Sequence, residues 1–201
     1  MAHLTAADLV ESGALPPRTL EACVECIRDC RTVMVTGVAG SGKTTLLRAL
    51  AGLLPDDETR LVFDSARALG LQGPQYEHVD VRGVDLMQSP GDTVAAALDC
   101  APRVLVIDDL CPPEAGLLLR ALGSGCHAGS LLALGAESVE AALRRLAAWS
   151  ALDGLSRQEA CFGVAAGIDL GVGLFRETWG HRVAEVAFVE AAQQGWTLRP
   201  A

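Results

Sequence analysis

Asparagine is absent from this chain of 201 residues, and lysine occurs only once. A guanine-specific N-K-x-D motif requires asparagine, so the GTPases that depend on that motif are excluded. Lysine and arginine together number 16, so all but one of these basic residues are arginine. Lys43 is therefore the one position where this chain uses lysine instead of arginine. Its compact ammonium group suits a site that needs a point charge, whereas the planar guanidinium group favours a bidentate partner.

Long apolar runs and a basic face are also lacking. Half of the residues are hydrophobic, but no uninterrupted run approaches the roughly 20 apolar residues of a membrane-spanning helix. The segment from Met1 to Thr5 lacks the basic and apolar parts of a signal peptide. A net charge of −9 argues against broad contact with nucleic acid or anionic lipid, and we interpret the adjacent Arg144 and Arg145 as a solvated edge. We expect a cytoplasmic protein with no nucleic-acid partner and no direct membrane insertion.

The seven cysteines are odd in number, and a cytoplasmic domain of this size needs no disulfide framework. Cys23, Cys26 and Cys30 have a C-x₂-C-x₃-C spacing that could hold a metal ion or cluster. The same spacing places them on one face of a helix, where cysteine acts as a small buried hydrophobe. No second Cys/His cluster in the sequence completes a tetrahedral site. We favour helix packing over a metal site.

The single lysine lies in a glycine-rich motif. Residues 37–44 read Gly-Val-Ala-Gly-Ser-Gly-Lys-Thr and fit G-x-x-x-x-G-K-[ST], the phosphate-binding loop or P-loop. Glycines let backbone N–H groups turn inward around an anion at a helix N-terminus. Lys43 would reach the β- and γ-phosphates, and Thr44 would give Mg²⁺ a hydroxyl ligand. We predict ATP and Mg²⁺ as ligands, with these binding residues: Gly37, Gly40, Ser41, Gly42, Lys43, Thr44 and Thr45.

The segments around this motif make a chance match improbable. Thr32 to Thr36 is a short β-branched apolar run, as expected of a buried strand. Thr45 to Leu53 has helical spacing and ends near Gly52 and Pro55. The motif therefore has the strand–loop–helix context that a P-loop needs.

A second motif follows about 65 residues later. Val104 to Ile107 is continuously apolar, as a central parallel strand should be, and is followed by Asp108 and Asp109. An acid at the carboxyl end of such a strand is the Walker B pattern, whose carboxylate holds Mg²⁺ or its water. The alternative is a strand-capping turn without a role. We predict Thr44 and Asp108 as metal ligands, although the pattern does not decide between Asp108 and Asp109.

The rest of the chain alternates strands with helices. Further strands are predicted at residues 61–63, 78–81, 130–134, 168–174 and 181–189, the last two as an antiparallel pair, with a tail at 196–198. Further helices are predicted at residues 4–12, 19–30, 92–98, 113–122, 138–149 and 158–166. This alternation predicts an α/β fold of three layers, with a mostly parallel sheet flanked by helices. We expect a helical linker over residues 1–31 and one P-loop NTPase core over 32–201.

The order of these motifs resembles the type II/IV secretion and pilus-assembly ATPases, specifically their tight-adherence (Flp pilus, CpaF-like) branch. Residues 124–130 are similar to the T-G-H-x-G-S box of this family with one residue inserted. The other similar segments are residues 8–16, 34–51, 165–170 and 182–186. The resemblance implies a RecA-like, hexameric motor core that works with secretion or pilus machinery proteins as a homo- or hetero-oligomeric ring. Through these partners it would lie at the inner face of the membrane.

The resemblance also implies an N-terminal domain that closes over nucleotide. Met1 falls about where the linker to the core begins, so we expect this domain to be missing or to come from a separate chain. The Glu-Asp pair of the acidic box is Phe63-Asp64 here, and a family histidine matches Gly135. Arg82 matches an arginine that reaches nucleotide phosphates in the family.

The Walker B box of the family ends Gly-Glu-x-Arg. Here the acid is Asp108 or Asp109, and Leu110 or Cys111 replaces the arginine. The catalytic candidates are thus Asp108, Asp109 and Asp64. Groups that bind nucleotide are kept while groups that act on the γ-phosphate are lost. Because a lost arginine finger can cost on the order of 10³-fold, we expect slow hydrolysis.

Three functions fit these features. The first is a motor-type ATPase that drives or supports assembly of a secretion or Flp-type pilus machine. The second is a hydrolysis-deficient, ATP-binding scaffold or regulator of such a motor. The third is a small-molecule kinase, which the absence of arginine from residues 123–129, where a lid would lie, disfavours.

Overall fold

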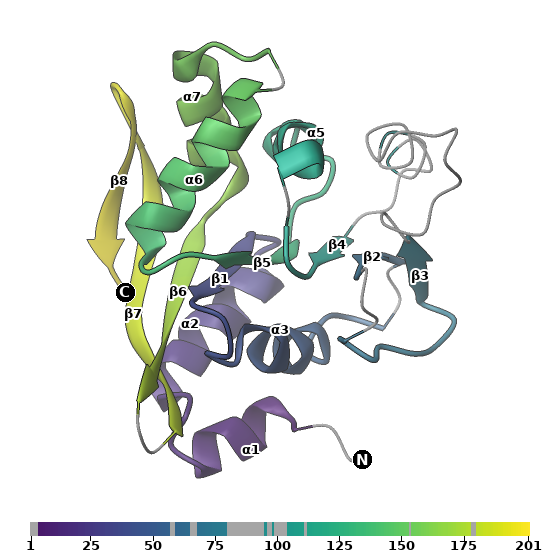
Figure 1. Ribbon diagram of the computed structural model, residues 1–201. Helices are drawn as coiled ribbons and strands as arrows, with labels where there is room; N and C mark the ends of the chain where they lie inside the picture. The colour runs from purple at the N-terminus through teal and green to yellow at the C-terminus, as the bar shows by residue number, and fades with distance from the viewer. Residues whose placement is uncertain are drawn as a thin grey trace.

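The computed structural model describes residues 4–56, 59–64, 68–79, 95, 98, 104–110, 112–152, 154–177 and 180–201. Eight strands form one sheet in the order β3-β2-β4-β5-β1-β6-β7-β8. Strands β1 to β6 pair in parallel, and β7 and β8 continue the sheet in antiparallel fashion (Figure 1). Their bounds are β1 (Val33–Gly37), β2 (Arg60–Phe63), β3 (Tyr76–Val79), β4 (Val104–Ile107), β5 (Leu131–Gly135), β6 (Leu170–Glu177), β7 (Gly180–Ala192) and β8 (Gly195–Pro200).

Helices cover both faces of this sheet (Figure 1). One apolar cluster joins α1, α2 and α3 to one face, and a second joins α5, α6 and α7 to the other. The helix bounds are α1 (Ala6–Glu11), α2 (Pro17–Arg28), α3 (Lys43–Ala51), α5 (Pro112–Gly123), α6 (Val139–Leu152) and α7 (Arg157–Gly167). The predicted three-layer α/β fold is confirmed.

Strand β1 lies between β5 and β6, and all five of its residues are buried. Val33 and Val35 belong to the cluster on the α1–α3 side, whereas Met34 belongs to the cluster on the other side. This alternation is the period-two pattern of a strand with both faces covered. The loop that follows β1 therefore starts from the most enclosed part of the sheet.

Local interactions determine where the first two helices begin. The Thr5 side chain accepts the backbone N–H of Asp8, and the Asp8 side chain accepts the N–H of Thr5, so this capping box fixes the start of α1. Pro17 is the first residue of α2, where its missing N–H is not needed. Both helices pack into the same core as β1.

The three clustered cysteines have different environments. Cys23 and Cys26 are buried in α2, which confirms the packing interpretation for these two. Burial raises the pKa of the Cys23 thiol to about 12. Cys30 is exposed beyond the end of α2, with a φ of 53°, so it takes no part in that packing. Among the described residues, no group of three or more His, Cys, Asp and Glu side chains could hold a metal ion.

The carboxyl-terminal part differs from the prediction in one respect. Residues 196–198 were expected to form a tail, but they belong to β8, which pairs along β7 from Ala187 to Ala192. The predicted strand at 78–81 is β3, which starts two residues earlier, and residues 80 and 81 lie outside the described part. Of the predicted helix at 92–98, only residues 95 and 98 are described, and both are helical. No helix in the described ranges is both long and apolar enough to cross a membrane.

Candidate nucleotide-binding site

The P-loop joins the end of β1 to the start of α3. Gly42 caps α3 with a φ of 94°, a conformation that glycine adopts at little cost. A Cβ atom on Gly37 would collide with the Ser41 side chain and lie 2.8 Å from the carbonyl oxygen of Leu174 on β6. These two glycines are therefore required by the shape of the loop itself.

Lys43 and Ser41 line the inside of this loop. The Nζ atom of Lys43 donates to the carbonyl oxygen of Val38 at 3.0 Å, so the ammonium group lies within the curve of the loop. The Ser41 hydroxyl is fully buried and has no hydrogen-bond partner among the described residues. The backbone N–H of Ser41 donates to Val38 at 3.1 Å and helps to close the turn.

Two side chains from separate elements meet beside the loop. The hydroxyl of Thr44, in the first turn of α3, donates to Oδ2 of Asp108 at 2.9 Å. Asp108 follows β4, and its backbone N–H donates to Phe63 at 2.9 Å, so the β2–β4 pairing sets its position. Asp109 is exposed and has a φ of 55°. Asp108 is thus the residue that the structure brings to Thr44.

The electrostatics of Asp108 suit a cation. Burial raises the pKa of its carboxyl group, and the charges of Asp64 and Asp109 raise it further, while the Thr44 hydrogen bond and Lys43 act in the opposite direction. The ionised carboxylate is therefore incompletely compensated by the protein. A hydroxyl oxygen beside such a carboxylate is the hard oxygen donor set that Mg²⁺ prefers, so these residues fit the metal.

Asp64 is close to this pair but is engaged in a different task. Its two carboxylate oxygens accept the backbone N–H groups of Ala68 at 3.0 Å and Leu69 at 2.6 Å. Arg48 of α3 donates to the carbonyl oxygens of the same two residues, each at 2.6 Å. Asp64 and Arg48 together hold the segment that follows β2. A direct role for Asp64 in catalysis stays a prediction.

The positions where family groups are lost can also be located. Gly135 ends β5 directly beside Gly37, and Arg145 of α6 donates to its carbonyl oxygen. Arg145 is exposed, in keeping with the predicted solvated edge, and it also binds the end of this strand. Leu110 is buried, and its N–H donates to Ala133 at 3.2 Å. Arg82 and Cys111 lie outside the described residues.

Residues 124–130 have a structural role at the amino ends of the strands, away from the P-loop. The Ser130 hydroxyl accepts the backbone N–H of Leu105 at 2.9 Å and donates to the carbonyl oxygen of His127 at 2.6 Å. Both His127 and Ser130 are buried. Since Ser130 precedes β5 and Leu105 lies near the start of β4, this box supports the amino ends of two strands.

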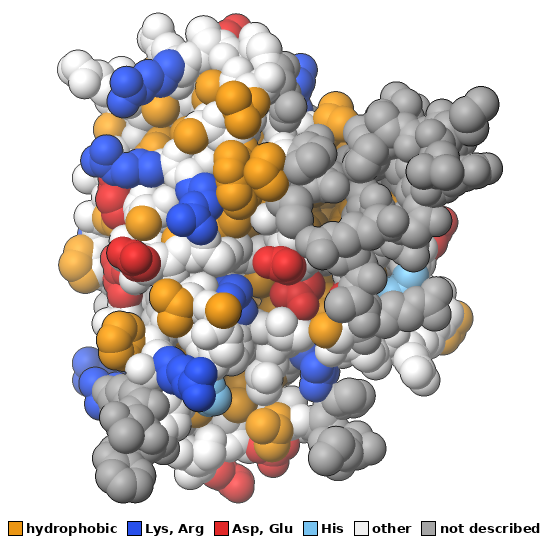
Figure 2. All heavy atoms as spheres, viewed as in Figure 1, with side chains coloured by type: hydrophobic (Ala, Val, Ile, Leu, Met, Phe, Trp, Pro, Cys, Tyr) orange, Lys and Arg blue, Asp and Glu red, His pale blue; other side chains and the backbone are white. Residues whose placement is uncertain are grey.

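The hairpin between β6 and β7 contributes residues that the sequence alone did not reveal. The Nε2 atom of His181 lies 2.6 Å from the carbonyl oxygen of Gly40. Because a carbonyl oxygen only accepts, Nε2 carries the proton and donates it. Arg182 lines a cavity of about 610 Å³ together with His181 and the P-loop. Figure 2 shows basic side chains beside a histidine on one face of the molecule. The apolar wall of this cavity comes from these residues: Leu4, Leu9, Leu15, Leu46, Leu174 and Val183.

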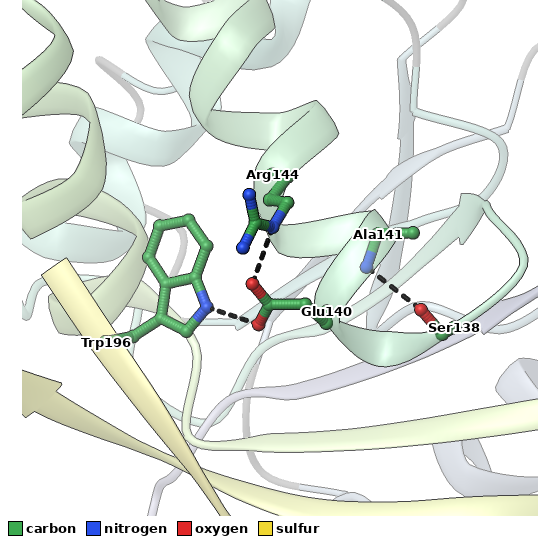
Figure 3. A network of polar contacts seen from close by, with 5 residues as sticks. All are labelled: Ser138, Glu140, Ala141, Arg144 and Trp196. Carbon is green, nitrogen blue, oxygen red and sulfur yellow. Dashed lines mark hydrogen bonds and ion pairs between the residues drawn. The ribbon is translucent and has the colours of Figure 1, made fainter.

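A larger cavity, of about 980 Å³, lies between α6, α7 and β8. Glu140 anchors its rim, because its carboxylate accepts both Trp196 Nε1 at 2.9 Å and Arg144 Nε at 2.7 Å (Figure 3). The Arg144 side chain is 70% exposed, in keeping with the predicted solvated edge. The P-loop residues do not line this cavity.

This chain is similar in sequence and in fold to known proteins. The family model described as Type II/IV secretion system protein matches residues 4–158. The type IV secretion system protein PtlH of Bordetella pertussis is 34% identical over 122 residues, which cover 58% of this chain and 35% of PtlH. The VirB11 ATPase from the Brucella suis type IV secretion system, solved in complex with sulphate, superposes with a TM-score of 0.76 at 23% identity. That superposition covers 90% of this chain and 54% of the VirB11 chain.

A solved structure of the pilus retraction motor PilT with bound ADP has the same fold, with a TM-score of 0.61 at 16% identity. It covers 95% of this chain and 53% of the PilT chain. This chain therefore spans about a third of PtlH and about half of the two solved relatives.

Proposed function

The chain belongs to the type II/IV secretion system protein family, and from that premise we propose that it binds ATP with Mg²⁺ as a motor-type ATPase. The observation that carries the proposal is the hydrogen bond between Thr44 and Asp108 beside a glycine-shaped loop. A hydroxyl at a helix N-terminus and a carboxylate at a strand end are the two protein ligands of Mg²⁺ in P-loop NTPases. Here they come together from two separate elements.

Each residue of the loop has a definite task in this proposal. The backbone N–H groups of Gly40, Gly42, Lys43 and Thr44 surround the phosphates, helped by the dipole of α3, while that of Ser41 closes the turn. Lys43 exchanges the Val38 carbonyl for phosphate oxygens, which are the stronger, charged acceptors. Thr44 and Asp108 hold Mg²⁺, and Thr45 lies next along the helix. When bound, Mg²⁺ neutralises charge on the β- and γ-phosphates.

Hydrolysis by the isolated chain should be slow. Phe63 is buried in the core and carries no acid, and Gly135 offers no side chain toward the γ-phosphate. Among the described residues, Asp64, Asp108 and Asp109 are then the acids that could orient water. We propose that a neighbouring subunit or a partner chain of a secretion or Flp-type pilus machine supplies the missing groups, in a ring at the cytoplasmic face of a membrane.

The test combines binding and turnover. Mg·ATP at a hundred times Kd should stabilise the fold by about 2.7 kcal/mol, and Lys43→Ala should abolish that stabilisation without unfolding the protein. Arg28→Ala is the control, since this arginine is 70% exposed and, among the described residues, pairs with the adjacent Asp29. Phosphate release is then measured at concentrations that permit oligomers. A folded wild-type protein that shows no stabilisation by Mg·ATP would contradict the proposal.

The scaffold function is the second candidate. Gly135 favours it, because glycine has no side chain where the family has a histidine. A Cβ atom at this position would meet only Arg145 Nη1, at 4.0 Å, so a larger side chain has room. Gly135→His should raise turnover if the chain is a motor that lacks this group. An unchanged rate, with ATP binding intact, would favour the scaffold.

A further inference from the structure

The end of β6 passes directly above the P-loop. Gly37, the last residue of β1, pairs with Leu174 of β6, and β6 continues to Glu177. Arg176 therefore lies two residues beyond the end of β1, on the same face of the strand as Leu174. Across the hairpin, Arg176 pairs with His181 of β7. Both side chains are thus placed by strand register rather than by the P-loop motif.

Two contacts fix these side chains over the loop. A Cβ atom built on Gly40 would lie 3.3 Å from Nη1 of Arg176, so the guanidinium group lies against that glycine. His181 donates from Nε2 to the carbonyl oxygen of Gly40 at 2.6 Å, and its ring would lie 3.6 Å from a Cβ atom on Gly42. The two glycines leave room for the hairpin as well as for a ligand.

The charge of Arg176 has no counterpart in the part of the chain that the structure describes. Among the described residues, this exposed side chain has no hydrogen bond and no ion pair. Lys43, which belongs to the P-loop itself, is a second cation. Two cations beside this glycine-rich loop form a site whose complementary ligand carries several negative charges.

We propose that Arg176 binds the phosphate chain of the nucleotide from within the same chain, while His181 positions the loop through Gly40. This inference rests on the proposed ATP binding and deepens it. A guanidinium group matches two phosphate oxygens at once, which Lys43 cannot do. Arg176 thus supplies a positive charge in addition to that of Lys43.

The experiment compares Arg176→Gln, Arg176→Lys and wild type by calorimetric titration with ATP and with inorganic tripolyphosphate. Arg28→Gln is the control, because it removes the same charge from an exposed side chain whose ion-pair partner is the adjacent Asp29. We expect Arg176→Gln to weaken both ligands at least tenfold, Arg176→Lys to restore only part of the affinity because lysine cannot bind two phosphate oxygens at once, and Arg28→Gln to bind as wild type does. Circular dichroism checks that each variant is folded.

Different outcomes separate this inference from the proposed function. If wild type binds ATP and Lys43→Ala abolishes binding, but Arg176→Gln stays within twofold of wild type, the inference alone is overturned. A loss for ATP without a loss for tripolyphosphate also overturns it, since the contact would then be to the nucleoside. A folded wild type that binds neither ligand overturns both.

Discussion

Replacing Thr44 with valine tests the pair at the centre of the site. Valine keeps the branched shape of threonine but removes the hydroxyl that donates to Asp108 at 2.9 Å. The partly buried carboxylate would then lose its one close side-chain donor among the described residues. The change therefore perturbs a charged hydrogen bond while leaving the helix and the loop glycines untouched.

The expected cost follows from that geometry. A hydrogen bond to a charged group contributes about 1.5–3 kcal/mol to the free energy of unfolding. Only one oxygen of Asp108 is at a good distance, since the second lies at 3.3 Å, and the carboxylate is still partly in contact with water. Both facts favour the lower end of the range. We expect Thr44→Val to lower the free energy of unfolding by about 1.5 kcal/mol at neutral pH.

The pH dependence gives this prediction a second signature. The folded state raises the pKa of Asp108, and the Thr44 hydrogen bond is among the influences that lower it, so the variant should raise that pKa further. A raised pKa means that the folded state binds a proton more readily than the unfolded state, so stability is lost as pH rises through the folded pKa. The deficit of the variant should thus grow with pH through this range and be smallest in acid, where Asp108 is protonated.

Urea denaturation at several pH values measures both quantities. Thr45→Val on the same helical turn is the matched control, because the Thr45 hydroxyl has no hydrogen bond in the described residues. Its free energy of unfolding should change by less than about 0.5 kcal/mol. A Thr44→Val deficit below about 0.5 kcal/mol, or one that is the same at every pH, would refute the reasoning.

Three further measurements have definite expected results. Gly37→Ala should lower the free energy of unfolding by about 1–3 kcal/mol in denaturant titration, because its Cβ atom would lie 2.8 Å from the Leu174 carbonyl oxygen. Cys30 should react with a thiol reagent at pH 8 in the native state. Cys23, whose pKa is about 12, should react only after unfolding. Equal rates for the two thiols would contradict the assigned burial. The affinity for Mg²⁺ should decline on acidification at a higher pH than for an ordinary aspartate, because the pKa of Asp108 is raised; isothermal titration across pH measures this.

The parts that sequence predicts well are those whose geometry is local. The strand, glycine loop and helix around Lys43 follow one another within about 20 residues, so their pattern specifies both the elements and their order. The continuous apolar run of β4 likewise predicts its own burial. In each case, the residues that set the structure are sequence neighbours.

The parts that sequence did not predict depend on distant pairings. The choice between Asp108 and Asp109 is made by the register of β4 against β2, which aligns Phe63 with Ile107. His181 reaches Gly40 across a separation of 141 residues, and no local motif indicates that contact. Strand β8 escaped prediction for the same reason, since its strand character comes from pairing with β7.

The central place of β1 has a consequence for the order of events during synthesis. The hydroxyl of Thr36 donates to Leu134, 98 residues later, and the N–H of Thr32 donates to Asp169, 137 residues later. At about 5–20 residues per second, roughly 7 to 27 s separate the emergence of β1 from that of its second neighbour. During this interval the P-loop is attached to a strand that is paired on one side at most. A nucleotide that binds as proposed can therefore stabilise the nascent chain only after the second neighbour of β1 has emerged.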